Sequence, residues 1–302
     1  MNLREMNYVV AIYEEQSISK AAERLYISQP SLSKFLINLE RELNAQLFDR
    51  TTNPLTPTEY GRAYIETARS MLNLNSDMLR RMEDIRNSET GLLRIGMSVV
   101  RSAYYIPMVL PEFHRRFPGI QISLEEESAT VLEQHLLQGR LDVAITSGIV
   151  MDPQINCEVI RRERIYFAVP RGYVKGADDS CKFGDVAPLI PWKQTRFVLL
   201  HKQQRVRQIA DQVFADYGLE PQVIMETKIT DTALKLCAKG MCCAFVSEVT
   251  KEDPFYRDME ADYYELDERY SLPVIAACRR GAYIPQSVRY FLQILNEGDG
   301  RA

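Results

Sequence analysis

Several hydrogen-bonding side chains near the start of the sequence share one face of a predicted helix, namely Gln29, Ser31, Ser33, Lys34 and Asn38. The opposite face is apolar and consists of Leu32, Phe35, Leu36, Leu39 and Leu43. Ser28 can cap this helix, and Pro30 suits its first turn. A three-residue break, residues 26–28, separates it from a preceding helix, as in a helix-turn-helix. The polar start of the second helix is therefore predicted to enter the major groove of DNA.

Hydroxyl and amide side chains gather further along the chain where predicted strands end and helices begin. They lie in Ser98–Ser102, at Ser128 and Thr130, at Thr146 and Ser147, in His201–Gln203, and at Thr230. In open α/β sheets, ligands bind beyond the carboxyl ends of the strands, where helix N-termini offer unpaired N–H groups. We therefore expect a small-molecule site at these loops. Each Ser or Thr could instead cap its own helix.

The sequence offers little for catalysis. It contains no G-x-G-x-x-G fingerprint, Walker-type loop or nucleophile elbow, and its three histidines, His114, His135 and His201, are scattered. Its six cysteines include no CxxC pair, so they fit neither a zinc site nor a disulfide framework. We expect a protein that is not an enzyme and has no cofactor. A two-lobed enzyme is the less favoured alternative.

Length and composition point to a globular protein of about two domains, because the chain has 302 residues and 46% of them are hydrophobic. The 37 basic and 41 acidic residues give a net charge of −4, so the total charge does not predict a polyanionic partner. No run approaches the roughly 20 apolar residues of a membrane helix, and residues 1–5 carry no signal-peptide block. The expected location is the cytoplasm, without membrane contact.

The first 90 residues contain a single glycine, Gly61, and read as helix almost throughout. Two short segments, residues 46–50 and 54–56, flank a turn and predict a small β-wing. A helix over residues 58–86, roughly 43 Å long at 1.5 Å per residue, is too long for a small domain to bury. We expect a second copy of the helix to cover its apolar positions. Those assigned to dimerisation are Tyr64, Met71, Leu74, Met78 and Met82.

Residues 91–302 alternate β-branched runs with helical stretches, which predicts parallel sheets with crossover helices. Two such series are separated by an extended run, residues 158–170, and a late strand, residues 273–278, could return to the first. We therefore expect an α/β protein. It comprises a mainly α winged helix-turn-helix (1–58), a linker helix (59–89) and a two-lobed α/β domain (90–302). Lobe I takes residues 90–160 and 270–302, and lobe II takes residues 161–269.

Four segments closely resemble the LysR-type transcriptional regulators: residues 17–25, 27–34, 39–40 and 47–51. Residues 111–113, 117–118 and 139–145 resemble the effector domain of that family more loosely. The resemblance implies winged helix-turn-helix regulators with paired linker helices, usually tetrameric, whose C-terminal halves look like periplasmic solute-binding proteins. It further implies that a small effector modulates promoter binding or activation. The expected partners are promoter DNA, the effector, further copies of the chain as a homodimer or homotetramer, and RNA polymerase.

Carried over by position, the base-reading residues of the family fall on Gln29, Pro30, Ser33 and Lys34, with Ser31 beside them. Gln can hydrogen-bond to adenine N6 and N7, and Pro30 can lie against a thymine methyl group. Lys34 lacks the bidentate geometry of the Arg that is common there in the family. The alternative is that these residues only form the solvated face of a packed helix.

The wing departs from the family, because Thr52, Asn53, Pro54 and Thr56 replace the usual basic residues and leave Arg50 as the nearby cation. Residues 17–50 carry five basic and four acidic side chains. Counterion release per chain should therefore be modest, and affinity should depend on avidity between linked chains.

The resemblance also places an effector site at the loops described above. We assign it to Ser98, Arg101, Ser102, Ser128, Thr146, Ser147, His201, Gln203 and Thr230. Arg101, surrounded by helix N-termini, favours a carboxylate or other anion as the effector. His201 could pair with the anion or serve only the local structure. A redox sensor of the same family is a further alternative, although its candidate thiols fit buried, inert cysteines better. These are Cys237, Cys242, Cys243 and Cys278.

Overall fold

The computed structural model describes residues 2–86, 90–148, 150, 152–178, 180–256 and 258–298. The chain forms two compact units, Met1–Asn87 with Gly281–Pro285, and Ser88–Arg280 with Gln286–Ala302. The predicted boundary at residues 87–91 falls mostly on residues 87–89, outside the described residues. Among the helices that the structure describes, none is long and apolar enough to cross a membrane.

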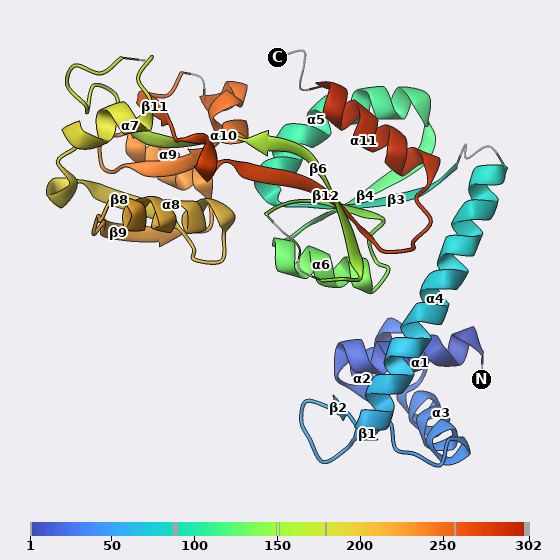
Figure 1. Ribbon diagram of the computed structural model, residues 1–302. Coiled ribbons are helices and arrows are strands. Elements are labelled where there is room, and N and C mark those ends of the chain that lie inside the picture. Colours follow the sequence, from blue (N-terminus) through green and yellow to red (C-terminus); the bar gives the residue numbers. More distant parts are fainter. Residues whose placement is uncertain are drawn as a thin grey trace. The chain divides into compact units, whose positions relative to one another are not determined.

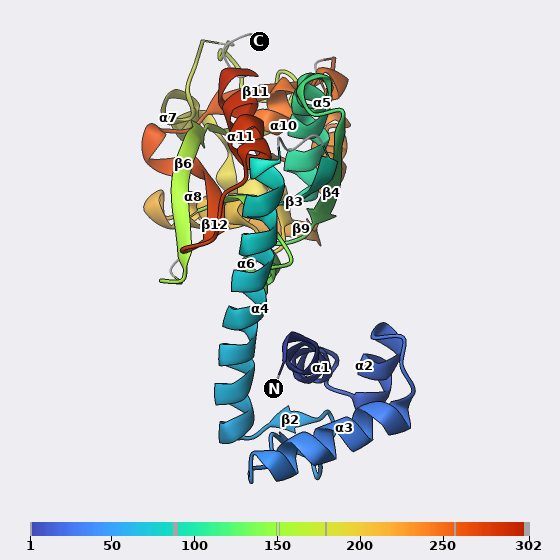
Figure 2. The same ribbon diagram turned by 90° about the vertical axis from the view of Figure 1, so that its right-hand side faces the viewer.

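The first unit is a winged helix-turn-helix followed by a long helix, as predicted (Figure 1). Its elements are α1 (Leu3–Glu15), α2 (Ile18–Arg24), α3 (Gln29–Glu42), β1 (Phe48–Asp49), β2 (Thr56–Pro57) and α4 (Glu59–Ile85). Each helix starts at a side-chain cap, provided by Asn2, Ser17, Ser28 and Thr58 respectively. Figure 2 shows α4 continuing well beyond the three short helices.

Gly61 fixes the start of α4 against the wing. A Cβ atom at this position would lie 1.9 Å from the carbonyl oxygen of Leu47, so only glycine fits. The same junction is tied by the backbone N–H of Thr58, 3.0 Å from that oxygen, and by its hydroxyl, which donates to Gln46 O at 2.6 Å. The single glycine of the helical region therefore marks a close approach of two backbone segments.

Lobe I of the second unit is a five-stranded sheet in the order β4-β3-β5-β12-β6. The strands are β3 (Thr90–Met97), β4 (Gly119–Glu126), β5 (Val143–Ser147), β6 (Ile155–Glu163) and β12 (Leu272–Arg279). The helices of this lobe are α5 (Val99–Arg116), α6 (Ala129–Leu137) and α11 (Gln286–Gly298). Helices α5 and α11 pack together through Phe113 and Phe291, and α6 packs on Ala144 and Ala277 of the sheet (Figure 1).

Lobe II has an antiparallel group, β10-β7-β11, and a parallel pair, β8-β9. A parallel bridge between Phe197 and Cys243 joins the two. The strands are β7 (Ile165–Pro170), β8 (Arg196–Leu200), β9 (Gln222–Thr227), β10 (Ala244–Ser247) and β11 (Ala261–Glu265). The helices are α7 (Phe183–Val186), α8 (Arg205–Asp216), α9 (Thr230–Ala238) and α10 (Glu248–Glu252). Short 3-10 turns occupy residues 187–189, 192–194, 254–256 and 268–270.

The chain crosses between the lobes twice, as predicted, through β6 to β7 and back through β12. The prediction of parallel sheets is wrong in part. Strand β12 runs antiparallel to β5 and β6, because the outward and returning crossovers must point in opposite directions. Helix α5 begins at Val99 and therefore takes in most of Ser98–Ser102, which was expected to be a loop. Its first two residues, Val99 and Val100, are β-branched and have low helix propensity, so the sequence does not indicate that the helix starts there.

Candidate nucleic-acid interface and ligand site

The first turn of α3 presents polar side chains to solvent. Gln29 and Pro30 are its first two residues and both are exposed, while Leu32 and Leu36 behind them are fully buried. Ser31 and Lys34 are also exposed, and Ser33 is half-buried. The hydroxyls of Ser28 and Ser31 lie 2.7 Å apart, so Ser31 takes part in the cap of the helix. The buried side of α3 fixes which of its residues can reach a groove.

Arg50, the predicted wing cation, is held by a carboxylate that the sequence analysis did not single out. Its Nη2 lies 2.7 Å from Oε2 of Glu40. The other oxygen of Glu40 accepts the backbone N–H groups of Leu47, at 2.8 Å, and Phe48, at 3.3 Å. The sequence carried a signal for this role, since Glu40 follows Leu36 by four residues and so lies on the apolar side of α3, where the structure buries it. Glu40 thus positions the wing and offsets part of the charge of Arg50.

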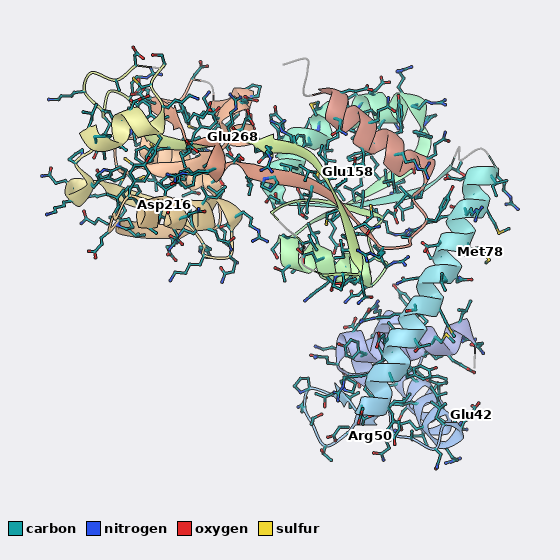
Figure 3. The ribbon with its side chains drawn as sticks, viewed as in Figure 1. Glu42, Arg50, Met78, Glu158, Asp216 and Glu268 are labelled. Atoms are coloured by element: carbon teal, nitrogen blue, oxygen red, sulfur yellow. The ribbon has the colours of Figure 1, made fainter. Side chains whose placement is uncertain are left out.

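The residues assigned to dimerisation divide into two groups. Met71, Leu74, Met78 and Met82 are exposed along α4, and Met78 points away from the helix (Figure 3). Leu79 and Ile85 extend this exposed row toward the end of α4. Tyr64, by contrast, is half-buried and packs against the apolar clusters of its own unit. Among the described residues, the exposed apolar row of α4 therefore runs from Met71 to Ile85.

In lobe I, the register of the parallel strands brings the predicted ligand residues to one edge of the sheet. Met97 of β3 pairs with Glu126 of β4 and with Ile145 of β5. The residues just beyond these pairs therefore share an edge, and they are Ser98, Ser102, Ser128, Thr146 and Ser147. Ser98 and Ser128 directly precede α5 and α6.

Lobe II brings the remaining predicted residues together in the same way. Leu200 of β8 pairs with Thr227 of β9, so His201 and Gln203 follow one strand and Thr230 follows the other. His201 is half-buried, Gln203 is exposed and Thr230 is buried.

Arg205, which the sequence analysis missed, links the two edges. Its Nε lies 3.3 Å from the carbonyl oxygen of Ser147, and its side chain passes over Gly148. Gly148 has a φ of +92°, and a Cβ there would lie 2.7 Å from Arg205 Nε. A cation at the first residue of a helix, as Arg205 is in α8, opposes the helix dipole and was an available signal.

The helices at these edges lack the side-chain caps that all four helices of the first unit have. Within the described residues, no side chain caps α5, α6, α8 or α9. The capping alternative for Ser98 and Ser128 therefore finds no support, because neither hydroxyl bonds the first turn of its helix. Uncapped N–H groups at four helix starts favour binding of an anion.

Two buried polar atoms at the lobe I edge also lack hydrogen-bond partners among the described residues. These are Oγ1 of Thr146 and Nε of Arg101. The Nη2 of Arg101 pairs with Glu163 at 2.7 Å, and the hydroxyl of Tyr105 donates to the same fully buried carboxylate at 3.2 Å. The charge of Arg101 is therefore largely matched by Glu163. Arg205 adds a second cation at the same edge.

The hydroxyl of Ser102 is already engaged. Its Oγ lies 2.9 Å from the carbonyl oxygen of Val99 and contacts Oε1 of Glu126. Glu126 thus brings a carboxylate to the edge that carries Arg101. Any ligand there meets charges of both signs.

The thiols of the redox alternative lie in surroundings that suppress reactivity. Burial raises the pKa of Cys237 and Cys243, and it raises the pKa of Cys242 to about 11 and of Cys278 to about 12. Because the thiolate is the reactive form, these residues are protonated at neutral pH and poorly nucleophilic. The surroundings of these four thiols therefore disfavour a switch based on their oxidation.

Comparison with known families gives two matches that together cover nearly the whole chain. Residues 3–62 match the model of the bacterial regulatory helix-turn-helix protein, lysR family. Residues 86–299 match the LysR substrate binding domain. The first match contains α3, and the second contains both strand edges described above.

Curated relatives of similar length support these matches. An uncharacterized HTH-type transcriptional regulator, YcgK, of Bacillus subtilis (strain 168) is 26% identical over 309 residues, which cover 98% of this chain and 94% of that protein. A probable RuBisCO transcriptional regulator of Porphyra purpurea is 28% identical over 251 residues, which cover 81% of this chain and 77% of that protein.

Solved structures share the architecture over their full length. A full-length OxyR variant from Pseudomonas aeruginosa has a TM-score of 0.75 at 20% identity, covering 98% of this chain and 94% of that one. Full-length CbnR in complex with its target DNA has a TM-score of 0.60 at 22% identity, covering 99% and 100%. Full-length BenM has a TM-score of 0.58 at 26% identity, covering 100% and 99%.

Proposed function

Because the chain belongs to the LysR family of transcriptional regulators, we propose that α3 reads promoter DNA and that a small effector in the second unit controls it allosterically. In this proposal Gln29, Pro30, Ser33 and Lys34 meet base edges, and Arg50 meets a phosphate. The observation that carries it is the exposed polar first turn of α3 opposite a fully buried stripe.

The exposed row on α4 supports self-association. Met71, Leu74, Met78 and Met82 present an apolar surface that a second copy of α4 would cover. Pairing would hold two α3 helices at a fixed separation, which a dimeric helix-turn-helix needs to read two half-sites. We propose a homodimer that assembles into a homotetramer and acts in the cytoplasm, where it meets promoter DNA and RNA polymerase.

The effector site is proposed at the two strand edges joined by Arg205. Among the described residues, the uncapped helix starts, the unpartnered Oγ1 of Thr146 and Nε of Arg101, and the cation Arg205 suit a small anion such as a carboxylate. Ser98, Ser128, Ser147, His201, Gln203 and Thr230 complete the assignment. Ser102 contributes through its contact with Glu126.

Thr146→Val is expected to weaken binding of the effector about 10-fold, because an isosteric side chain removes one buried hydrogen-bonding group. DNA affinity should stay unchanged. The measurement is a thermal-shift screen of small carboxylates, phosphates, neutral metabolites and amines with the full chain, followed by titration of each stabilising compound.

Thr250→Val is the matched control, since the hydroxyl of Thr250 in α10 is also buried and without a partner in the described part of the chain. This variant should respond to the compound as the wild type does. Equal responses of the two variants would refute the placement of the site at Thr146. Stabilisation by neutral or cationic compounds alone would refute the anion.

The dependence of DNA binding on salt should be shallow, because the charge of Arg50 is partly offset by Glu40, Asp49 of β1 is acidic and residues 51–57 carry no charge. Asn53→Arg should steepen the slope of log K against log salt by about 0.9 per chain, the value for one added phosphate contact. Fluorescence anisotropy between about 50 and 200 mM salt measures both slopes. An unchanged slope in the variant would place the wing away from the DNA backbone.

A further inference from the structure

Tyr26 lies in the turn between α2 and α3, and its side chain is 96% exposed. It is the most exposed of the large hydrophobic residues in the parts of the chain that the structure describes. An aromatic ring left in water contributes almost nothing to the stability of the fold.

The backbone at Tyr26 is also unfavourable for this residue type. Its N–H donates to Glu23 O at 3.1 Å, and the N–H of Ile27 donates to Ala22 O at 3.0 Å, which closes α2 with a Schellman motif. Tyr26 occupies the left-handed position of that motif, with a φ of 54°. Glycine is usual there because a Cβ atom is disfavoured.

Two other non-glycine residues in the described chain have positive φ, and they show how unusual Tyr26 is. They are Gln16, with a φ of 50°, and Asn44, with a φ of 49°. Asn44 ends α3 in the same motif, since its N–H donates to Arg41 O and that of Ala45 donates to Glu40 O. Asn tolerates this conformation through its short polar side chain, whereas Tyr has no such compensation. Neither burial nor backbone geometry therefore accounts for a tyrosine in the turn.

We propose that Tyr26 is a further DNA contact, whose phenol hydroxyl donates a hydrogen bond to a backbone phosphate beside the groove that α3 enters. The inference rests on the proposed function of α3. Tyr26 stands two residues before the cap Ser28 and so flanks the exposed first turn. Tyrosine hydroxyls are among the groups that bond phosphate oxygens and set the register of a protein on the duplex. A neutral donor also suits an interface with few cations.

The test uses three variants of the full chain: Tyr26→Phe, Tyr26→Gly and Asn44→Gly. The wild-type chain first enriches a bound duplex from a random-sequence pool. Dissociation constants are then measured at fixed salt for that duplex and for a shuffled one of equal length, together with melting temperatures.

Tyr26→Phe should bind both duplexes about 3- to 10-fold more weakly, the loss of one hydrogen bond, with an unchanged melting temperature. The factor should be the same on both duplexes, because a phosphate contact carries no sequence information. Tyr26→Gly should melt about 2–5 °C higher while binding at least as weakly as Tyr26→Phe. Asn44→Gly, at the far end of α3, should keep the wild-type affinity.

Wild-type affinity in Tyr26→Phe would overturn the proposal, and so would a loss confined to the enriched duplex, which would indicate a base contact. A higher melting temperature with unchanged affinity in Tyr26→Gly would also overturn it. Failure of the wild-type chain to enrich any duplex would refute the proposed function itself, and with it this contact. That failure is visible before any variant is made.

Discussion

Glu163→Gln is expected to lower the free energy of unfolding of the second unit by about 3–5 kcal/mol. Glu163 is fully buried and pairs with Arg101, which is itself buried. An amide at this position keeps the shape of the side chain but removes its charge, so the guanidinium of Arg101 is left uncompensated in a region of low dielectric. The fluorescence of Trp192, the single tryptophan, reports on unfolding of the aromatic core in urea.

Two controls separate this effect from a general loss of charge. Glu112→Gln removes one partner of the exposed pair with Arg115 and should change stability by less than about 1 kcal/mol. The double variant Arg101→Met/Glu163→Met should recover most of the lost stability, since neither residue then carries a buried charge. A single variant as stable as the wild type would show that the pair is not needed to compensate Arg101.

The ion pair between Arg101 and Glu163 lies at the crossover between the lobes, because Glu163 is the last residue of β6, where the chain leaves lobe I. Just beyond it, Arg164 and the nearby Arg161 pair with Glu248 at the start of α10. Burial disfavours the charged form of Glu248, but hydrogen bonds and charges from Arg164 and Arg161 outweigh burial and lower its pKa. The crossover is thus held by α5 through Glu163 and by α10 through the two arginines. A ligand that contacts Arg101 would act on this junction.

Gln29→Ala is expected to reduce discrimination between the bound sequence and single-base variants of it by about 1–3 kcal/mol, the value of one bidentate contact to a base. Gln29 is the first residue of α3 and is exposed, so the substitution leaves the core intact. Affinity for a shuffled duplex and stabilisation by an effector should be preserved. Competition binding against a panel of single-base variants measures the effect.

Asn38→Ala is the matched control for Gln29→Ala. It removes an exposed amide from the same helix, further from the first turn, and should leave discrimination unchanged. Equal behaviour of the two variants would contradict the assignment of Gln29 to base reading.

The elements that could be predicted from the sequence are those specified by residues close to one another in the chain. The predicted helix 58–86 begins within one residue of α4, whose first turn is capped by Thr58, and α3 was identified from Ser28, Pro30 and its apolar stripe. These signals lie within a few residues of the structure that they specify. The double crossover followed from the order of strands and helices alone.

The features that could not be predicted from the sequence depend on contacts between segments far apart in the chain. Arg101 and Glu163 are 62 residues apart, and Arg205 meets Ser147 across 58 residues. The residues next to Arg101 in the sequence do not indicate that Glu163 neutralises its charge. The prediction that Arg101 binds an anionic effector therefore did not account for this pair. The antiparallel placement of β12 depends likewise on a return from the other lobe.

The most direct test of the central claim, that paired chains present α3 to duplex DNA, is selection from a random-sequence pool with the full-length chain, followed by sedimentation of the complex. The account predicts an inverted repeat, with half-sites about one helical turn or a multiple of it apart, bound by two or four chains. A monomer that enriches no sequence would contradict it.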